Sequence, residues 1–414
     1  MTGRRALGDL ALVSGGKALS LGATFACGVL VARAAGAAEY GFFAAALSLA
    51  LILDALIGSP LDFSAVRFGA ELRDDPARVD RLQGAAFRLK LLAGLVLVAL
   101  ALSFGRPLAA LVFGDARRSL LAATAMLAAL CLLLARGTAA HLQIHERFTL
   151  FAALDTLQGL LRILALAALA LAGTRTAEPF LGAWGAGAAG AFLVAAAVVP
   201  QPYLRAGWPD RKDARAIATH SGAVAGVVAL GTLTGRIDVL ILSAVRPGQE
   251  AGCYAAAVHV ALLVSLLAGY ASVIAQPRVI PMARGGRLPA LLAGNAIAAA
   301  ALSVLMVPAA LFAVPRLLPF LFGPGFACAV PVLQILLVGS CADMFFMPVP
   351  MTYTLQVRPA RALLGEAVIT LLFVAAAGGT ARAGPLQMAA LATGARVLKL
   401  VLYWGIAWPS ASAR

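Results

Sequence analysis

Two apolar stretches of the sequence carry cationic side chains at depths where a bilayer would surround them. In the first, Asp155, Gln158 and Arg162 stand at i, i+3 and i+7, which places them on one face of a helix. In the second, Arg396 and Lys399 lie three residues apart. A guanidinium binds phosphate oxygens in bidentate fashion, so these residues predict a binding site for a phosphate-bearing substrate.

Each of these charges also has a structural alternative. Arg162 would be equally at home in an ion pair with Asp155 or with a carboxylate of another helix, because an unpaired charge within a span is costly. Lys17, a further candidate for substrate binding, and Lys399 would also reach the aqueous surface along their aliphatic stems. Four acids within the apolar runs either neutralise the cations or carry a coupling proton or sodium ion: Asp54, Asp155, Asp343 and Glu366.

Other reactive residue types show no arrangement that predicts catalysis or metal binding. His141 and His145 form an i,i+4 pair, but no third metal ligand accompanies them. The five cysteines lack metal-ligand or redox spacing, and small core residues explain them better than disulfides. No phosphate-binding loop, nucleophile elbow or dinucleotide fingerprint is present. We therefore expect neither an enzyme nor a bound cofactor or metal.

The composition is that of a membrane protein. Of the 414 residues, 62% are hydrophobic and 12% charged, whereas soluble domains carry roughly 45–50% apolar and about 25% charged residues. This excludes a cytosolic enzyme, a disordered chain and a secreted disulfide scaffold. The net charge of +15 comes without a nucleic-acid-binding motif, so it indicates positive-inside bias and attraction to anionic lipids rather than a nucleic-acid partner.

The apolar residues fall into long runs that predict an all-α polytopic membrane protein. A span needs about 20 mostly apolar residues, and a membrane barrel would show short alternating strands instead. We count twelve runs near residues 11–32, 40–61, 89–105, 119–140, 150–172, 180–200, 219–244, 252–275, 289–313, 328–352, 363–380 and 386–408.

Positive charge predicts the orientation of these runs. With the N-terminus inside, the inner segments hold 19 of the 33 Lys and Arg residues and the outer segments eight, and the remaining six lie within the runs. The positive-inside rule then places both termini in the cytoplasm, and an even number of spans agrees with this.

An internal repeat divides the chain into two similar halves. At an offset of 211 residues, the octapeptide from Glu39 to Ala46 matches the one from Glu250 to Ala257, and at an offset of 209 Phe113-Gly114 matches Phe322-Gly323. Six spans per repeat give both halves the same orientation, as in transporters built from parallel repeats. We therefore expect two six-helix bundles, residues 1–205 and 206–414, that face each other across a cleft and work by alternating access.

Three passages resemble those of the bacterial polysaccharide biosynthesis flippases. Residues 31–43, VARAAGAAEYGFF, are similar to the family's A-R-x-L-G-x-x-E-Y-G between its first two spans, with Ala35 in place of the usual Leu. DVLIL from Asp238, followed by GCY from Gly252, resembles the passage that opens the second half. LFGPGF from Leu321, followed by PVL, is similar to the family's L-F-G-x-x-F/Y … P-V-L.

The resemblance implies a flippase of the multidrug/oligosaccharidyl-lipid/polysaccharide superfamily with a MATE-like fold. Such proteins move an undecaprenyl-diphosphate-linked glycan from the inner to the outer leaflet of the cytoplasmic membrane, for O-antigen or exopolysaccharide synthesis. Its partners would be membrane lipids and the glycosyltransferases and polymerase of the same pathway. A drug or ion exporter of related fold, a polytopic enzyme of glycan assembly and a non-transporting scaffold remain as alternatives.

The charge distribution makes the topology testable. Reporter fusions after residues 80, 210 and 285 are expected to read as cytoplasmic, and fusions after residues 115 and 248 as periplasmic, because of the positive-inside bias. A periplasmic signal after residue 210 would contradict the arrangement of six spans on either side of it.

Overall fold

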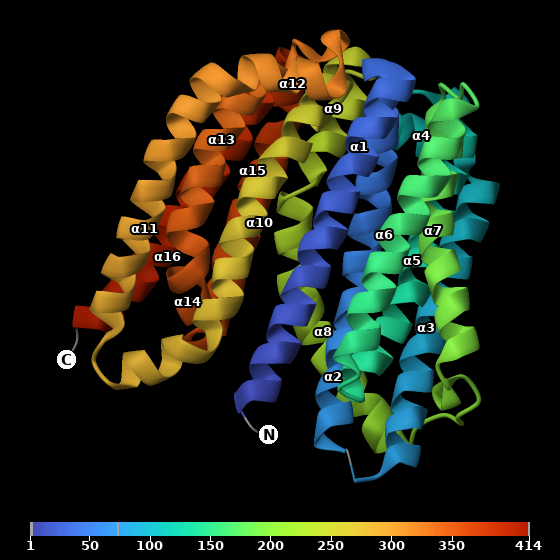
Figure 1. The fold of residues 1–414 in the computed structure, drawn as a ribbon, viewed down its shortest axis with the longest axis vertical. Helices are drawn as coiled ribbons and strands as arrows, with labels where there is room; N and C mark the ends of the chain where they lie inside the picture. The colour runs from blue at the N-terminus through green and yellow to red at the C-terminus, as the bar shows by residue number, and fades with distance from the viewer. Residues whose placement is uncertain (1–2, 73, 413–414) are drawn as a thin grey trace. The chain divides into compact units, whose positions relative to one another are not determined.

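The computed structural model describes the backbone of residues 3–72 and 74–412, which form helices and turns without a β-strand (Figure 1). The side chains of residues 3–18, and of some others, mainly between 223 and 280 and from 409 onward, lie outside this description. Within it, ten helical segments are long and apolar enough to cross a membrane. The chain is therefore a multi-pass membrane protein.

Helices cover all twelve predicted runs. One segment, Leu19–Gly69, contains the run 40–61 and the part of the run 11–32 from Leu19 onward. Gly36, with φ 79° and ψ 173°, separates these two runs within α1 (Gly3–Leu53). The run 219–244 is not among the ten segments, but α8 (Arg211–Thr234) and α9 (Ile237–Val245) cover it. The predicted all-α fold class is thus confirmed.

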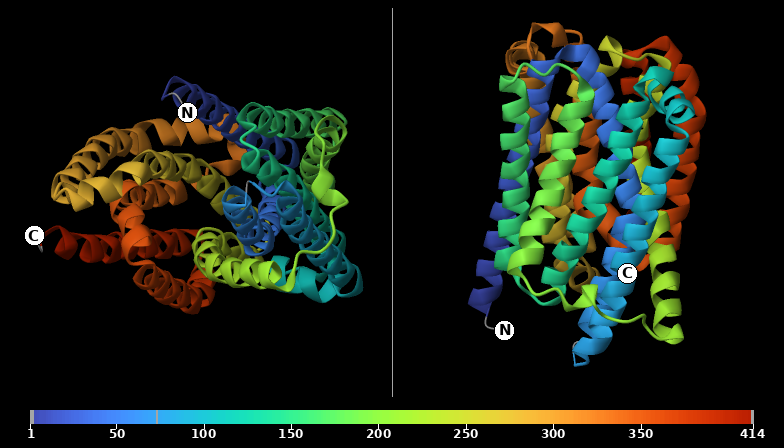
Figure 2. Two further views of the ribbon diagram at one scale, coloured as in Figure 1. Left: turned by 90° about the horizontal axis from the view of Figure 1, so that it is seen from below. Right: turned by 90° about the vertical axis from the view of Figure 1, so that its right-hand side faces the viewer.

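The first of two compact units comprises Met1–Ala35 and Phe42–Thr232. Besides parts of α1 and α8, it contains α2 (Ser59–Glu71), α3 (Pro76–Ser103), α4 (Gly105–Phe113), α5 (Ser119–Ile144), α6 (Phe148–Leu171) and α7 (Ala177–Val198). α5 packs against α3 and α7, and α7 packs against α6, so the long helices of this unit lie side by side (Figure 2). Asp75 caps α3 by accepting a hydrogen bond from the Arg78 amide, with Pro76 at the first helical position.

The second compact unit comprises Gly36–Gly41 and Leu233–Arg414. Besides α9, its helices are α10 (Gln249–Arg284), α11 (Leu288–Pro308), α12 (Val314–Phe322), α13 (Ala329–Phe346), α14 (Thr352–Val357), α15 (Pro359–Ala383) and α16 (Pro385–Ser412). α13 packs against α10 and α16, and α16 packs against α15.

Two π-helical turns interrupt the long helices of the second unit at prolines. The turn Ala309–Ala313 follows Pro308, and the turn Met347–Met351 contains Pro348 and Pro350. A proline lacks the N–H for the regular helical hydrogen bond, so a wider turn absorbs the break without ending the helix.

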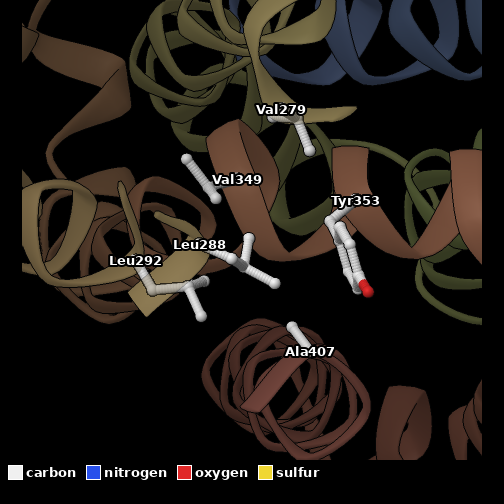
Figure 3. Close-up of a cluster of buried hydrophobic side chains, with 6 residues drawn as sticks. All are labelled: Val279, Leu288, Leu292, Val349, Tyr353 and Ala407. Atoms are coloured by element: carbon white, nitrogen blue, oxygen red, sulfur yellow. The ribbon is translucent and has the colours of Figure 1, made fainter. Parts of the chain in front are cut away.

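An apolar cluster holds five elements of the second unit together (Figure 3). It joins α10, α11, the π-turn before α14, α14 itself and α16 through buried side chains: Val279, Leu288, Leu292, Val349, Tyr353 and Ala407. The figure shows the six side chains converging from these separate helices.

The internal repeat is visible in the backbone. α4 and α12 are both nine residues long, and each ends in a fully packed phenylalanine, Phe113 and Phe322. The glycine that follows has a positive φ in both cases, 66° at Gly114 and 107° at Gly323, which only glycine adopts readily. A 3₁₀ turn then leads into a long helix, α5 or α13. The match at offset 209 is therefore a structural equivalence.

The two segments matched at offset 211, which begin at Glu39 and Glu250, contact each other closely through their backbones inside the second unit. A Cβ on Gly252 would lie 1.7 Å from the Ala37 carbonyl oxygen, and a Cβ on Gly41 would lie 2.7 Å from the Gly252 nitrogen. Beside this contact Tyr40, 2% exposed, packs edge-on against Phe322 at 6.1 Å between ring centroids. The segment Gly36–Gly41 thus belongs to the second unit although its flanking helices belong to the first.

One prediction about the cysteines is wrong. Cys253, at the start of α10, and Cys328, just before α13, form a disulfide across 75 residues of sequence. Disulfides persist in oxidising compartments, and both cysteines stand at the ends of spans that the charge count assigns to the outer side. The remaining three, Cys27, Cys131 and Cys341, are free, with Cys27 buried.

The first turns of α8 pack with the first unit. The Asp213 carboxylate accepts two hydrogen bonds from Arg78 at 2.6 Å, and Ser221 Oγ lies 2.8 Å from Ser64 Oγ. The compact units accordingly change at Thr232. The division into bundles of residues 1–205 and 206–414 stays a proposal.

The contact at Gly252 yields a prediction on stability. Gly252→Ala is expected to lower the yield and the thermal unfolding midpoint of the purified protein strongly, because the new Cβ would overlap the Ala37 carbonyl and overpacking costs about 1–3 kcal/mol or more. Gly269→Ala in the same helix is the control, since nothing lies within 4 Å of its Cβ position. Equal midpoints for the two variants would contradict the close contact.

Candidate functional site

The two cations of α16 are both neutralised within the second unit. Arg396 Nη1 lies 3.5 Å from Asp343 Oδ2 and donates a hydrogen bond to Ser340 Oγ at 3.1 Å. The absence of a side chain at Gly339 makes room for this arginine, since a Cβ there would lie 2.9 Å from Arg396 Cδ. Asp343 also accepts a 2.6 Å hydrogen bond from Ser265.

Lys399 makes the second pair. Its ammonium nitrogen lies 2.7 Å from Glu366 Oε2, and Tyr403 donates a 2.9 Å hydrogen bond to Glu366 Oε1. The Glu366 and Lys399 side chains are only 4% and 13% exposed. The structure therefore brings Arg396, Lys399, Asp343 and Glu366 together as two ion pairs that join α16 to α13 and α15.

Two further pairs in the first unit were not predicted. Arg136 Nε lies 2.8 Å from Asp54 Oδ2, an ionic contact in which neither oxygen of the buried Asp54 accepts a directed hydrogen bond. Lys90, 1% exposed, pairs with Asp62. Asp54 is among the four acids named from the sequence, whereas Asp62 and its partner Lys90 are not. Asp62 follows Asp54 by eight residues, about two helical turns, and that spacing is the sequence signal that could have identified it.

Asp54 occupies a backbone irregularity as well as an ion pair. It begins the π-helical turn Asp54–Gly58, and a Cβ on Gly58 would lie 2.8 Å from its Oδ1 atom. Such turns inside α-helices are frequent at functional sites.

Arg162 differs from these four cations. It is 8% exposed, its guanidinium carbon lies 3.7 Å from the centroid of the Trp184 ring, and its Nε donates a 3.2 Å hydrogen bond to the Trp184 carbonyl. The Nη2 atom is buried without a hydrogen-bond partner. Gly187 leaves space for the side chain, because a Cβ there would lie 2.5 Å from Arg162 Cγ.

The alternative of an ion pair between Arg162 and Asp155 is absent among the residues that the structure describes. Asp155 instead lines a small cavity of about 40 Å³ together with Gln158 and Thr138. This cavity has room for little more than a water molecule or a small cation. Lys17 lies in α1, but its side chain is outside the described residues.

Among the described side chains, no group of three or more His, Cys, Asp or Glu residues is placed to hold a metal ion. Among the residues that the structure describes, the candidate site thus consists of ion pairs within each unit and of Arg162, a buried arginine that lies against no carboxylate.

Comparison with known proteins gives a family and a fold. The sequence pattern of the family described as polysaccharide biosynthesis protein matches residues 9–282. No curated protein matches the chain.

Three solved structures illustrate the fold. The lipid II flippase MurJ in its inward closed conformation has a TM-score of 0.78 at 12% identity, over 96% of this chain and 87% of that one. An inward-facing MATE family transporter of the MOP superfamily has a TM-score of 0.72 at 14% identity, over 95% of both chains. A MOP superfamily transporter from Pyrococcus furiosus has a TM-score of 0.57 at 14% identity, over 98% of this chain and 94% of that one. The likeness shows the fold that this chain shares with them.

The pair of Lys399 and Glu366 makes a prediction about stability. Glu366→Gln alone is expected to destabilise the protein by about 3–5 kcal/mol, because it leaves a buried ammonium without its partner, and the double variant Glu366→Gln/Lys399→Met is expected to recover most of this loss. Thermal unfolding midpoints in detergent measure both. The exposed pair of Arg246 and Glu250 is the control, where Glu250→Gln should cost less than about 1 kcal/mol. If the double variant were no more stable than Glu366→Gln alone, the destabilisation would not come from the unpaired Lys399 ammonium.

Proposed function

Because the chain belongs to the polysaccharide biosynthesis protein family, we propose that it is a flippase for a lipid-linked oligosaccharide. The substrate would be a glycan on a polyprenyl diphosphate, moved from the inner to the outer leaflet of the cytoplasmic membrane by alternating access. The all-helical fold that it shares with MOP superfamily transporters supports transport rather than catalysis. The glycan would enter O-antigen or exopolysaccharide synthesis, and both termini would lie in the cytoplasm.

The observation that carries this proposal is the unmatched charge of Arg162. The four other cations described above each lie against a carboxylate, whereas no carboxylate among the described residues pairs with Arg162. A central arginine costs at least about 2.5–3.5 kcal/mol on insertion scales, which favours a functional reason for keeping it. A diphosphate supplies the negative charge and the acceptor oxygens that Nη2 lacks.

Arg396 and Lys399 take a secondary part in this proposal. Both are already neutralised, so they would bind a phosphate only by exchanging Asp343 or Glu366 for it. Release of a carboxylate in this way would make that acid available for a proton, which offers one route from substrate binding to ion coupling. Lys17 remains a candidate from its sequence position.

Asp155 is our first choice for the ion-coupling residue. Asp54, Asp343 and Glu366 are engaged with cations, whereas Asp155 lines a cavity of about 40 Å³ beside the oxygen-bearing side chains of Thr138 and Gln158. Carboxylate, amide and hydroxyl oxygens suit a hard cation or a hydrated proton.

Replacement of Arg162 tests the proposal. Arg162→Met keeps an apolar chain over the Trp184 ring but removes the charge, so the protein is expected to reach the membrane in normal amount while binding of the lipid-linked glycan falls about tenfold to a hundredfold. Arg162→Lys keeps the charge without the planar fork and is expected to recover part of the binding. Glycan export in cells and binding to purified protein are the two measurements.

Arg117→Met, at an exposed arginine of the same unit, is the matched control and should leave both measurements unchanged. Normal export by Arg162→Met would refute the assignment. Loss of folded protein that Asp155→Asn restores would show that Arg162 has a structural role instead. Unchanged glycan export with altered drug resistance would favour an exporter of the related fold.

A further inference from the structure

Residues 201–215, which connect α7 to α8 and include the first turn of α8, are held firmly against the first unit, and we call this segment the strap. Tyr203 within it is fully buried. Arg88 on α3 donates hydrogen bonds to the carbonyl oxygens of Ala206, at 2.6 Å, and Gly207, at 2.8 Å. Because the buried tyrosine and these hydrogen bonds fix the position of the strap, the face that it turns away from the first unit is well defined.

The solvent-exposed face of the strap carries a large aromatic side chain. Trp208 is 63% exposed, although the Arg88 guanidinium covers part of its ring at 4.7 Å from the centroid. Leu204 beside it is 39% exposed. An exposed tryptophan next to a guanidinium suits the bilayer interface, where one side of the ring is apolar and the other is wet.

The same surface is strongly basic. Its acids are Asp210, which is exposed, and Asp213, which is occupied by the two hydrogen bonds from Arg78. These bonds hold the pKa of the Asp213 carboxyl below its ordinary value, so it stays ionised and neutralised by Arg78. Four exposed basic residues remain on the strap: Arg205, Arg211, Lys212 and Arg215.

The position of the strap in the chain sets its depth. The helix α7, which is long and apolar enough to span a membrane, ends at Val198. The strap begins three residues later and runs into the first turn of α8. In Figure 1 it lies at the same end of the first unit as the turn between α2 and α3. A segment so close to the end of a span meets lipid headgroups before it meets bulk solvent.

We propose that the strap is a docking surface for anionic phospholipid headgroups. The four basic side chains bind the phosphates of the adjacent leaflet, and Trp208 and Leu204 enter the interface between headgroups and acyl chains. Each Lys or Arg near an anionic surface adds to binding, and the sum is enough to anchor the end of the first unit to the leaflet while the protein works.

Lipid binding to the full-length protein in neutral detergent tests this proposal. The probes are phosphatidylglycerol and phosphatidylcholine, titrated against wild type and against the triple variant Arg205→Gln/Arg211→Gln/Arg215→Gln. The affinity for phosphatidylglycerol is expected to fall about a hundredfold in the triple variant, and the wild-type affinity is expected to fall steeply between 0.1 M and 1 M salt. The weaker binding of phosphatidylcholine should not change.

A second triple variant, Arg106→Gln/Arg117→Gln/Arg175→Gln, removes three exposed arginines of the same unit that the charge count assigns to the outer side. It is expected to keep the wild-type affinity for phosphatidylglycerol. Trp208→Ser is expected to weaken the binding of both lipids, because it removes the apolar contribution. Unfolding midpoints near wild type establish that the variants are folded.

Three outcomes would overturn the proposal. Equal losses in the two triple variants would show that the attraction is not specific to the strap. Displacement of phosphatidylglycerol by inorganic phosphate at similar concentration would indicate a free-anion site. Unchanged lipid binding in the strap variant, accompanied by loss of a co-purifying protein, would assign the surface to a protein partner.

Discussion

A charge within the hydrocarbon of a bilayer needs a counter-charge or a polar ligand, and this requirement organises the interior of both units. In the second unit, α16 supplies the cations and α13 and α15 supply the acids. In the first, Asp54 pairs with Arg136 of α5, and Asp62 of α2 pairs with Lys90 of α3. Because each pair joins different helices, it also selects which helices lie together and in which rotation. Arg162 differs from these cations because it contacts the Trp184 ring and the Trp184 carbonyl oxygen instead of a carboxylate.

The course of the helices could be predicted because hydrophobic length is a local property of the sequence. The twelve runs and the repeat with its Phe-Gly pairs required no knowledge of distant contacts. The disulfide of Cys253 and Cys328 could not be predicted without such knowledge, since 75 residues separate the two cysteines and neither lies in a cysteine motif. The membership of Gly36–Gly41 in the second unit was hidden for the same reason, because it depends on a backbone contact with Gly252.

The candidate site shows the same limit more sharply. Helical periodicity correctly places Asp155 and Arg162 on one face, but seven residues correspond to about 10 Å along a helix axis, too far for direct contact. The pairs of Arg396 with Asp343 and of Lys399 with Glu366 depend on the depth and rotation of separate helices. Sequence spacing identifies which charges are buried, whereas the three-dimensional packing decides which of them are neutral and which one is left over.

The segment Gly36–Gly41 has a consequence for how the protein is made. It leaves the ribosome between two helices of the first unit, but its packing partner begins at Gly248, 207 residues after Gly41. At roughly 5–20 residues per second, translation needs on the order of tens of seconds to bring the two together. The N-terminal half is therefore synthesised before the packing partner of this segment exists, and the second unit is completed around a piece of chain made long before the rest of it. No single cut in the chain yields two self-sufficient halves, so the order of synthesis is part of how this fold is completed.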